Sequence, residues 1–182
     1  MDWDGQEYQQ RFDALAASGA SVHGEAEFVM RYNPHTVLDA GCGTGRVGIE
    51  LATRGVTVVG ADPDSSMLKI ARALAKHIDW HEESMVDLDL QRTFDLVLMA
   101  GNVVLFTPPG TSAALFMGCT RHLALGGLLI NGFQLGRGYS PEQQDADCEA
   151  AGLRLQEQYS TWQAAPFDIN SDYRVTVHVR VE

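Results

Sequence analysis

Short apolar runs alternate with amphipathic segments along most of this chain, and the alternation becomes regular after residue 35. Runs rich in valine, leucine and isoleucine predict strands, whereas apolar residues at three- and four-residue spacing predict helices. The predicted strands are Thr36–Ala40, Val56–Ala61, Ile78–Glu82, Phe94–Ala100, Leu128–Phe133, Leu153–Trp162 and Asp172–Val181. The predicted helices are Gln6–Ala17, His23–Tyr32, Arg46–Arg54, Ser65–Lys76, Thr111–Leu123 and a last helix that starts after Ser140 and ends before Gly152.

The order of these elements predicts the topology. Strands that alternate with helices form a parallel, doubly wound sheet in α/β proteins. The last two predicted strands are separated by a short gap that contains no helix. A parallel pair would need a longer crossover, so we expect this pair to be antiparallel. The last strand has valines at alternate positions, which places Arg174, Thr176 and His178 together on the opposite face.

Length and composition are those of one soluble globular domain. The chain has 182 residues, of which 45% are hydrophobic and 20% charged. We expect residues 1–35 to form a helical lid and residues 36–182 to form the α/β core. The formal net charge is −11, and such a field repels the phosphate backbone. The charge therefore disfavours nucleic-acid partners.

The cysteines and the apolar stretches indicate the compartment. Cys42, Cys119 and Cys148 are far apart and match neither a disulfide framework nor a metal-ligand spacing. We expect buried thiols, no bound metal and a reducing cytoplasm. The longest apolar stretch, residues 96–106, is interrupted by glycine and asparagine and is too short to cross a bilayer. The acidic N-terminus does not resemble a signal peptide.

A glycine-rich turn follows the first predicted strand. The sequence Val37-Leu38-Asp39-Ala40-Gly41-Cys42-Gly43-Thr44-Gly45 ends an apolar run in an acidic residue and a turn, and a helical pattern begins at Arg46. Glycines in such a turn allow a ligand to lie against bare backbone. The dinucleotide fingerprint has glycines at positions one, three and six, but the sixth position here is Arg46. Glycines at positions one, three and five resemble motif I of the class I S-adenosylmethionine-dependent methyltransferases.

This resemblance implies a fold, a cofactor and a set of contacts. The fold is a mostly parallel seven-stranded sheet of the Rossmann-like methyltransferase type, with an antiparallel C-terminal hairpin. The cofactor is S-adenosyl-L-methionine, bound by the loops that follow the first four strands. The implied cofactor-binding residues are Asp39, Gly41, Cys42, Gly43, Gly45, Asp62, Pro63, Met67, Ser84, Met85, Ala100, Gly101 and Asn102.

Several of these residues have more than one interpretation. Asp62 ends the second strand, where its carboxylate can accept hydrogen bonds from both ribose hydroxyls. The alternative is that Asp62 or Asp64 caps the next helix. Asp39 can meet the amino group of the cofactor or orient the glycine loop. Met85 can cover the adenine ring or pack in the core.

The acceptor is less well defined. Aromatic and polar residues near the same edge are candidates for contacting it, namely Tyr8, Phe12, His23, Arg137 and Trp162. The Asn-Pro-Pro-Tyr type of segment found in methyltransferases of nucleic-acid bases is absent after the fourth strand, which reads Ala100-Gly101-Asn102-Val103. We therefore expect a small-molecule acceptor. A general base is needed only if the acceptor must lose a proton, so no catalytic residue is assigned.

Two other functions fit parts of the pattern. An NAD-type oxidoreductase could use a related sheet, but Arg46 replaces the third glycine of its fingerprint. A binding module for the adenosyl cofactor without turnover is the other alternative. The sequence predicts neither the attacking atom of the acceptor nor the oligomeric state.

Overall fold

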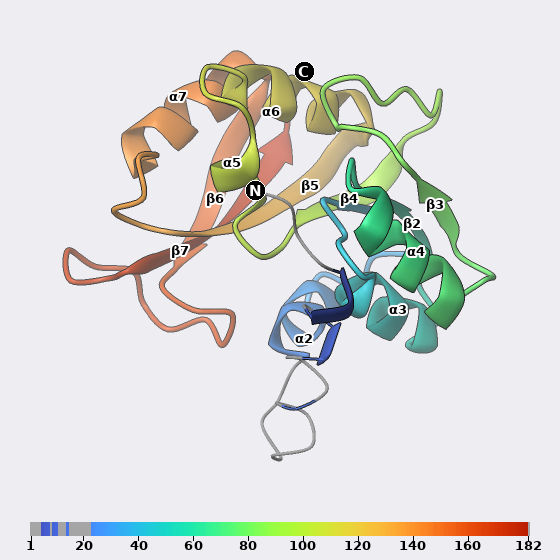
Figure 1. Ribbon diagram of the computed structural model, residues 1–182. Helices are drawn as coiled ribbons and strands as arrows, with labels where there is room; N and C mark the ends of the chain where they lie inside the picture. The colour runs from blue at the N-terminus through green and yellow to red at the C-terminus, as the bar shows by residue number, and fades with distance from the viewer. Residues whose placement is uncertain (1–4, 8, 11–13, 15–22, 182) are drawn as a thin grey trace.

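The computed structural model describes residues 5–7, 9, 10, 14 and 23–181, and within them the strands form one seven-stranded sheet (Figure 1). The strand order is β3-β2-β1-β4-β5-β7-β6. The strands are β1 Thr36–Ala40, β2 Thr57–Ala61, β3 Asp79–His81, β4 Phe94–Met99, β5 Leu123–Gln134, β6 Leu153–Tyr159 and β7 Tyr173–Arg180. The helices are α2 Gly24–Met30, α3 Arg46–Thr53, α4 Ser65–Leu74, α5 Val103–Phe106, α6 Ser112–Arg121 and α7 Pro141–Ala150.

The predicted topology is confirmed. Strands β1 to β5 pair in parallel, whereas β7 pairs antiparallel with both β5 and β6. The strand order reverses between β1 and β4, which are direct neighbours in the sheet. In open α/β sheets ligands bind at this reversal, beyond the carboxyl ends of the strands. The fold therefore places the glycine-rich turn after β1 where a ligand is expected.

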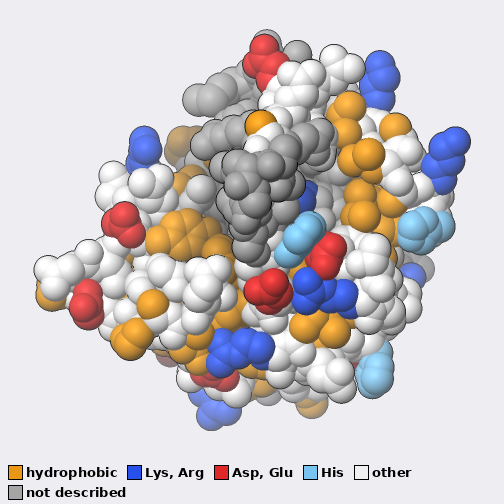
Figure 2. Space-filling model, turned by 90° about the horizontal axis from the view of Figure 1, so that it is seen from below, with side chains coloured by type: hydrophobic (Ala, Val, Ile, Leu, Met, Phe, Trp, Pro, Cys, Tyr) orange, Lys and Arg blue, Asp and Glu red, His pale blue; other side chains and the backbone are white. Residues whose placement is uncertain are grey.

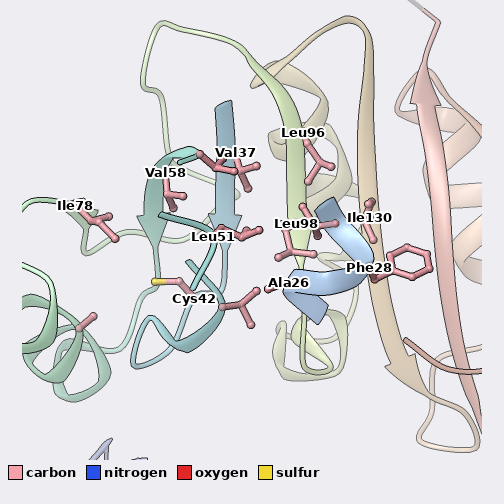
Figure 3. Packing of buried hydrophobic residues seen from close by; sticks show 14 of the residues in the cluster. Ala26, Phe28, Val37, Cys42, Leu51, Val58, Ile78, Leu96, Leu98 and Ile130 are labelled. Carbon is pink, nitrogen blue, oxygen red and sulfur yellow. The ribbon is translucent and has the colours of Figure 1, made fainter. Parts of the chain in front are cut away.

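Helices cover both faces of the sheet (Figure 1). Helices α2, α3 and α4 pack on one face, and α5, α6 and α7 pack on the other. Phe28 of α2 lies beside Ile130 of β5 in the first of these two cores (Figure 3). Ala26, Phe28 and Val29 are each at most 1% exposed. Helix α2 is therefore a layer of the core, although it belongs to the segment predicted as a lid.

The described residues of the first predicted helix, 6, 7, 9, 10 and 14, are helical, and so is Gly5 just before it. A Cβ on Gly5 would lie 2.7 Å from the carbonyl oxygen of Ser66, so this segment touches the start of α4. Tyr8 and Phe12, two of the predicted acceptor-binding residues, lie outside the described residues. Their role in a lid stays a prediction.

The structure differs most from the predicted elements in three places, and elsewhere bounds shift by one or two residues. Helix α5 was not predicted, because its four residues, Val103–Phe106, are all apolar and too few to show a helical spacing. Strand β5 begins at Leu123 rather than Leu128, and its pairing with β4 shifts register where Gly126 and Gly127 interrupt the apolar pattern. Strand β6 ends at Tyr159, so Trp162 lies in the loop that follows.

Strand β7 is buried on both faces. Its polar residues Arg174, Thr176 and His178 are at most 2% exposed, because α7 covers them. The Arg174 guanidinium donates to the carboxylate of Asp145 at 2.9 Å. Neither ring nitrogen of His178 has a partner among the described residues, and burial lowers its pKa to about 4. Alternation along β7 was predicted, but the burial of its polar face was not.

No helix among the described residues is both long enough and apolar enough to cross a membrane.

Candidate cofactor and acceptor site

The loops that follow β1, β2, β3 and β4 meet at one edge of the sheet, at the reversal of strand order. The first of these loops contains Gly41, Gly43 and Gly45, whose φ angles are 72°, 55° and 80°. Residues with a Cβ rarely adopt this left-handed conformation. Gly45 is also the N-cap position of α3, so Arg46 begins the helix. The three glycines are therefore required by the backbone of the turn itself.

Hydrogen bonds fix this loop to the end of β2. The backbone N–H groups of Gly41 and Cys42 donate to the carbonyl of Ala61 at 2.8 and 3.1 Å. The N–H of Gly43 donates to the carboxylate of Asp62 at 2.8 Å. The loop that follows β1 is thus held in one conformation by the neighbouring strand.

Close packing explains some of the same glycines. A Cβ on Gly45 would lie 2.6 Å from the Trp80 ring, and one on Gly60 would overlap that ring. Trp80 is buried and donates its indole N–H to the carbonyl of Ala75 at 2.9 Å. Sequence reasoning did not select Trp80, because a lone tryptophan in a short strand carries no local signal of what it packs against. A Cβ on Gly41 would lie 2.6 Å from Val103.

Two aspartates after β2 have different partners. Asp62 is 9% exposed and accepts from Gly43 and from the N–H of Asp64 at 2.9 Å. Burial raises the pKa of Asp62, and these two hydrogen bonds oppose the shift. Asp64 is the N-cap of α4 and accepts from the N–H groups of Ser66 and Met67. The capping role thus falls to Asp64, and Asp62 keeps acceptor capacity because a carboxylate offers about four lone-pair sites.

Asp39 lies beneath α3. It is 2% exposed, and its carboxylate accepts from the N–H of Gly48 at 3.0 Å. A Cβ on Gly48 would lie 2.9 Å from the same carboxylate, so glycine permits the approach. Burial raises the pKa of Asp39 to about 7. This contact corresponds to the alternative in which Asp39 orients the loop and helix.

The loops after β3 and β4 complete the edge. Ser84 is half-buried, and its hydroxyl accepts from the N–H of Val86 at 3.2 Å. The Met85 side chain is 4% exposed and belongs to the core beneath α6. Ala100 is half-buried, and Gly101 is exposed with a φ of 76° and no atom within 4 Å of a built Cβ. Pro63 is also exposed, whereas Met67 is buried.

Asn102 joins the exits of β4 and β5. Its φ is 69°, its N–H donates to the carbonyl of Gly132 at 3.1 Å, and its side-chain oxygen accepts from the N–H of Gln134 at 2.7 Å. The ends of these two strands are therefore held together beside the crevice.

The predicted acceptor residues do not all converge. Trp162 lies next to Gly132, where a built Cβ would overlap its ring, and it makes an edge contact with Phe28 at 5.6 Å. His23 lies 3.6 Å from Glu50, on the surface between α2 and α3. Arg137 is exposed between two left-handed glycines, and the described residues give it no ion-pair partner. Of these three residues, only Trp162 is joined to Asn102, through Gly132.

Sequence reasoning missed Tyr173. Its hydroxyl would lie 2.8 Å from a Cβ on Gly132, and the Trp162 ring lies against the same position. Burial raises the pKa of Tyr173 to about 12. The residue opens the valine-rich run of β7 and was therefore assigned to the apolar face. An open hollow of about 300 Å³ adjoins it, lined by Ser160, Thr161, Trp162, Gln163, Asp172 and Tyr173.

Ion pairs join α2 to α3. Arg46 donates to both carboxylate oxygens of Glu25, at 3.1 and 2.6 Å, and the two side chains are 13% and 16% exposed. Glu50 lies 3.6 Å from His23, which precedes α2, and it also pairs with Arg54 at the end of α3 at 2.7 Å. Figure 2 shows acidic and basic side chains side by side next to a histidine on the face seen from below. The first residue of α3 is thus tied to α2.

The cysteines are buried thiols, as predicted. Cys42, Cys119 and Cys148 are free, and burial raises the pKa of each. Within the described part of the chain, no three histidine, cysteine or acidic side chains lie close enough to hold a metal ion.

Comparison with known proteins gives concordant matches. The family described as "Methyltransferase domain" matches residues 37–127. The chain is similar to a TehB-like S-adenosylmethionine-dependent methyltransferase from Corynebacterium glutamicum, with 31% identity over 97% of both chains and a TM-score of 0.91. It also shares its fold with an S-adenosylmethionine-bound amino pentose methyltransferase from Micromonospora echinaspora (TM-score 0.78, 22% identity, 94% of this chain and 96% of that one).

A curated relative matches in sequence. The cypemycin N-terminal methyltransferase of a Streptomyces species is 34% identical over 125 residues, which cover 65% of this chain and 51% of that protein. The chain spans about half or less of the length of the curated relatives it matches.

Proposed function

Since the chain belongs to the class I S-adenosylmethionine-dependent methyltransferases, we propose that it transfers a methyl group from S-adenosylmethionine to a small-molecule acceptor. The feature that supports this most is the left-handed loop of Gly41, Gly43 and Gly45 at the reversal of strand order. The loop lies inside the matched residues 37–127. The same match argues against the NAD-type oxidoreductase.

The residues at the edge fit the cofactor. Asp62 retains acceptor capacity for ribose hydroxyls, which are hydrogen-bond donors. The hydroxyl of Thr44, in the glycine loop, is buried without a partner among the described residues, so it is free to bond a polar ligand atom. Gly101 is exposed and leaves open space after β4. The donor and acceptor set therefore suits an adenosyl amino acid.

Each loop has a proposed part in holding the cofactor. Asp62 binds the ribose, and the backbone of Gly41, Cys42, Gly43 and Gly45 lies against the ligand with Asp39 fixing the loop from below. The loops after the other strands are proposed to contribute Pro63, Met67, Ser84, Met85, Ala100, Gly101 and Asn102. Met85 contributes through its backbone or one edge of its side chain, because that side chain is packed in the core.

The main task of the protein in methyl transfer is to position the two reactants. When bound, S-adenosylmethionine supplies an electrophilic methyl carbon on a sulfonium. The chain's own residues must hold the attacking atom in line and keep water out, and positioning of this kind is worth roughly 7–11 kcal/mol in well-oriented systems. Asn102 holds the β4 and β5 exits together, which fixes the rim where the acceptor would meet the cofactor.

A small acceptor is supported by the surroundings of the rim. The hollow beside Trp162 and Tyr173 has a volume of about 300 Å³, at the lower end of the roughly 300–1,000 Å³ of small-molecule sites. The net charge of −11 disfavours nucleic acid. The relatives act on small molecules or peptide ends, as their names state: an amino pentose and the cypemycin N-terminus. Tyr8, Phe12, His23 and Arg137 remain proposed acceptor contacts, together with Trp162.

Two measurements test the function. Calorimetry should show that S-adenosylmethionine binds and that NAD does not compete; tighter binding of NAD would reverse the assignment. Incubation with a metabolite extract and a methyl-labelled donor should give a labelled small molecule. Binding of the donor with no labelled product under broad conditions would favour the module without turnover.

A further inference from the structure

We propose that the hollow beside Trp162 and Tyr173 is the acceptor subsite, and that it takes a polar small molecule whose amine nitrogen receives the methyl group. This inference rests on the proposed function. The hollow lies at the carboxyl edge of the sheet, because β6 ends and β7 begins where β5 ends.

The hollow is connected to the cofactor edge through Gly132. Asn102 donates to the carbonyl of this glycine, and the Trp162 ring and the Tyr173 hydroxyl cover its α-carbon. Any side chain at 132 would overlap Trp162. Glycine at this position therefore lets the two aromatic residues reach the rim where β4 and β5 end.

Tyr173 is arranged as a hydrogen-bond donor. The indole of Trp162 has only a donor, and its effect is to lower the pKa of Tyr173, so toward Trp162 the Tyr173 oxygen can act only as an acceptor. Its pKa is raised to about 12, so it stays protonated at neutral pH. Tyr173 can thus position an acceptor molecule, but it is not a base.

The charges of the lining select the acceptor. The six lining residues include the carboxylate of Asp172, two aromatic rings and several neutral hydrogen-bonding groups, but no lysine or arginine. Carboxylates and aromatic faces attract ammonium groups, and both repel anions. The lining therefore favours an acceptor with an amine and disfavours one with a carboxylate or phosphate near its reacting end.

The absence of a strong base among the lining residues favours nitrogen as the attacking atom. An amine that binds as an ammonium group first releases one proton to solvent. The neutral amine then attacks with its lone pair, which forms the N–C bond as the C–S bond breaks and the electron pair leaves on sulfur. The nitrogen then loses a proton to solvent. An alcohol would need to lose its proton at or before attack, and the six lining residues include no histidine, lysine or cysteine that could serve as its general base.

The test uses the full chain, methyl-labelled S-adenosylmethionine and three panels of small polyols. The polyols of the first panel bear an amine, those of the second bear only hydroxyls, and those of the third bear an amine and a carboxylate. We expect label on the nitrogen of the first panel, located by mass spectrometry. Label on oxygen, a preference for the carboxylate panel, or no transfer to any amine while the donor binds would overturn the inference. Failure of the donor itself to bind would instead overturn the proposed function.

Paired variants separate positioning from folding. Tyr173→Phe and Asp172→Asn should each raise the acceptor KM by about tenfold, with the donor Kd unchanged, because each removes one contact to the acceptor. Two control variants should leave KM unchanged. Tyr139→Phe removes a hydroxyl that bonds Asp147 on the other face of the sheet, and Asp89→Asn changes a carboxylate at the opposite edge. An unchanged KM in the first pair, or an equal rise in the controls, would contradict the assignment.

Discussion

The carboxylate of Asp39 accepts a hydrogen bond from the backbone N–H of Gly48 at 3.0 Å, which ties the end of β1 to the first turn of α3. Both groups are buried, and the close approach depends on the missing Cβ of Gly48. The glycine loop lies between these two residues in the sequence. Its geometry is therefore fixed from below by one buried carboxylate.

This contact predicts a pH dependence. The pKa of Asp39 is about 7 in the folded chain, against 3.8 for the unperturbed group, so the folded state binds the extra proton between these values. Rising pH in this window should lower the free energy of unfolding, by about 1.4 kcal/mol per unit of pKa difference, with no further loss above pH 7. Asp39→Asn removes this dependence. Urea denaturation at pH 5 and pH 8 should show that the free energy of unfolding of the variant, relative to that of the wild type, is higher at pH 8. An equal difference between the two proteins at both pH values would count against this role of Asp39.

Substitutions of Asp62 and Asp64 should have different effects on cofactor binding. Asp62→Ala is expected to weaken S-adenosylmethionine binding by about 2–3 kcal/mol through loss of the ribose contacts. It should also lower stability by about 1–3 kcal/mol, because the N–H groups of Gly43 and Asp64 lose their acceptor. Asp64→Ala removes the N-cap of α4 and should cost about 1 kcal/mol of stability with cofactor affinity unchanged. Calorimetry measures the cofactor affinity of each variant, and thermal melts measure its stability. An equal loss of affinity in the two variants would contradict the assignment of cofactor binding to Asp62 and capping to Asp64.

Gly45 is constrained both by its backbone and by a neighbour. Its φ is 80°, and a Cβ would lie 2.6 Å from Trp80. Gly101 has a φ of 76° with nothing within 4 Å, so it isolates the backbone cost of roughly 1–2 kcal/mol. Gly45→Ala should therefore destabilise more than Gly101→Ala, by a further ~1–3 kcal/mol of overpacking. Chemical denaturation of both variants measures the difference; similar losses would show that Trp80 adjusts freely.

The Glu25–Arg46 pair should contribute measurably to the docking of α2. The two side chains are mostly buried and bond through both carboxylate oxygens. A double-mutant cycle with Glu25→Gln and Arg46→Met should give a coupling of about 1–3 kcal/mol. The Arg72–Glu82 pair, at 3.4 Å with both side chains 46% exposed, is the matched control and should give about 0–1 kcal/mol. Equal couplings would mean that burial does not strengthen the first pair.

Much of the cofactor edge could be predicted from the sequence, because its signals are local. Glycines at 41, 43 and 45 predict a turn with left-handed residues, and all three φ angles are positive in the structure. The bounds of β1 were predicted to the residue, since a short apolar run between a proline and a glycine turn has sharp ends. Helix α7 starts after Ser140 as predicted, and Ser140 and Gln143 form a capping box, a local signal because it involves residues three positions apart.

Contacts between distant segments were not predictable in this way. Trp80 packs on Gly45 and Gly60, and Tyr173 meets Trp162 over Gly132, although nothing near these residues in the sequence marks the encounter. The polar face of β7 is buried because α7 covers it. Alternation along a strand predicts which residues share a face, but not whether another element covers that face.

The sequence by itself determined the alternation of strands and helices, the glycine turn and the family, since backbone conformation and periodicity are properties of neighbouring residues. Only the tertiary structure decided that Asp64 caps α4, so that Asp62 keeps free acceptor sites at the edge of the sheet. It also decided that α2 is a core layer and that Tyr173 and Trp162 meet over Gly132. These depend on which elements pack together, and packing is set by the whole chain at once.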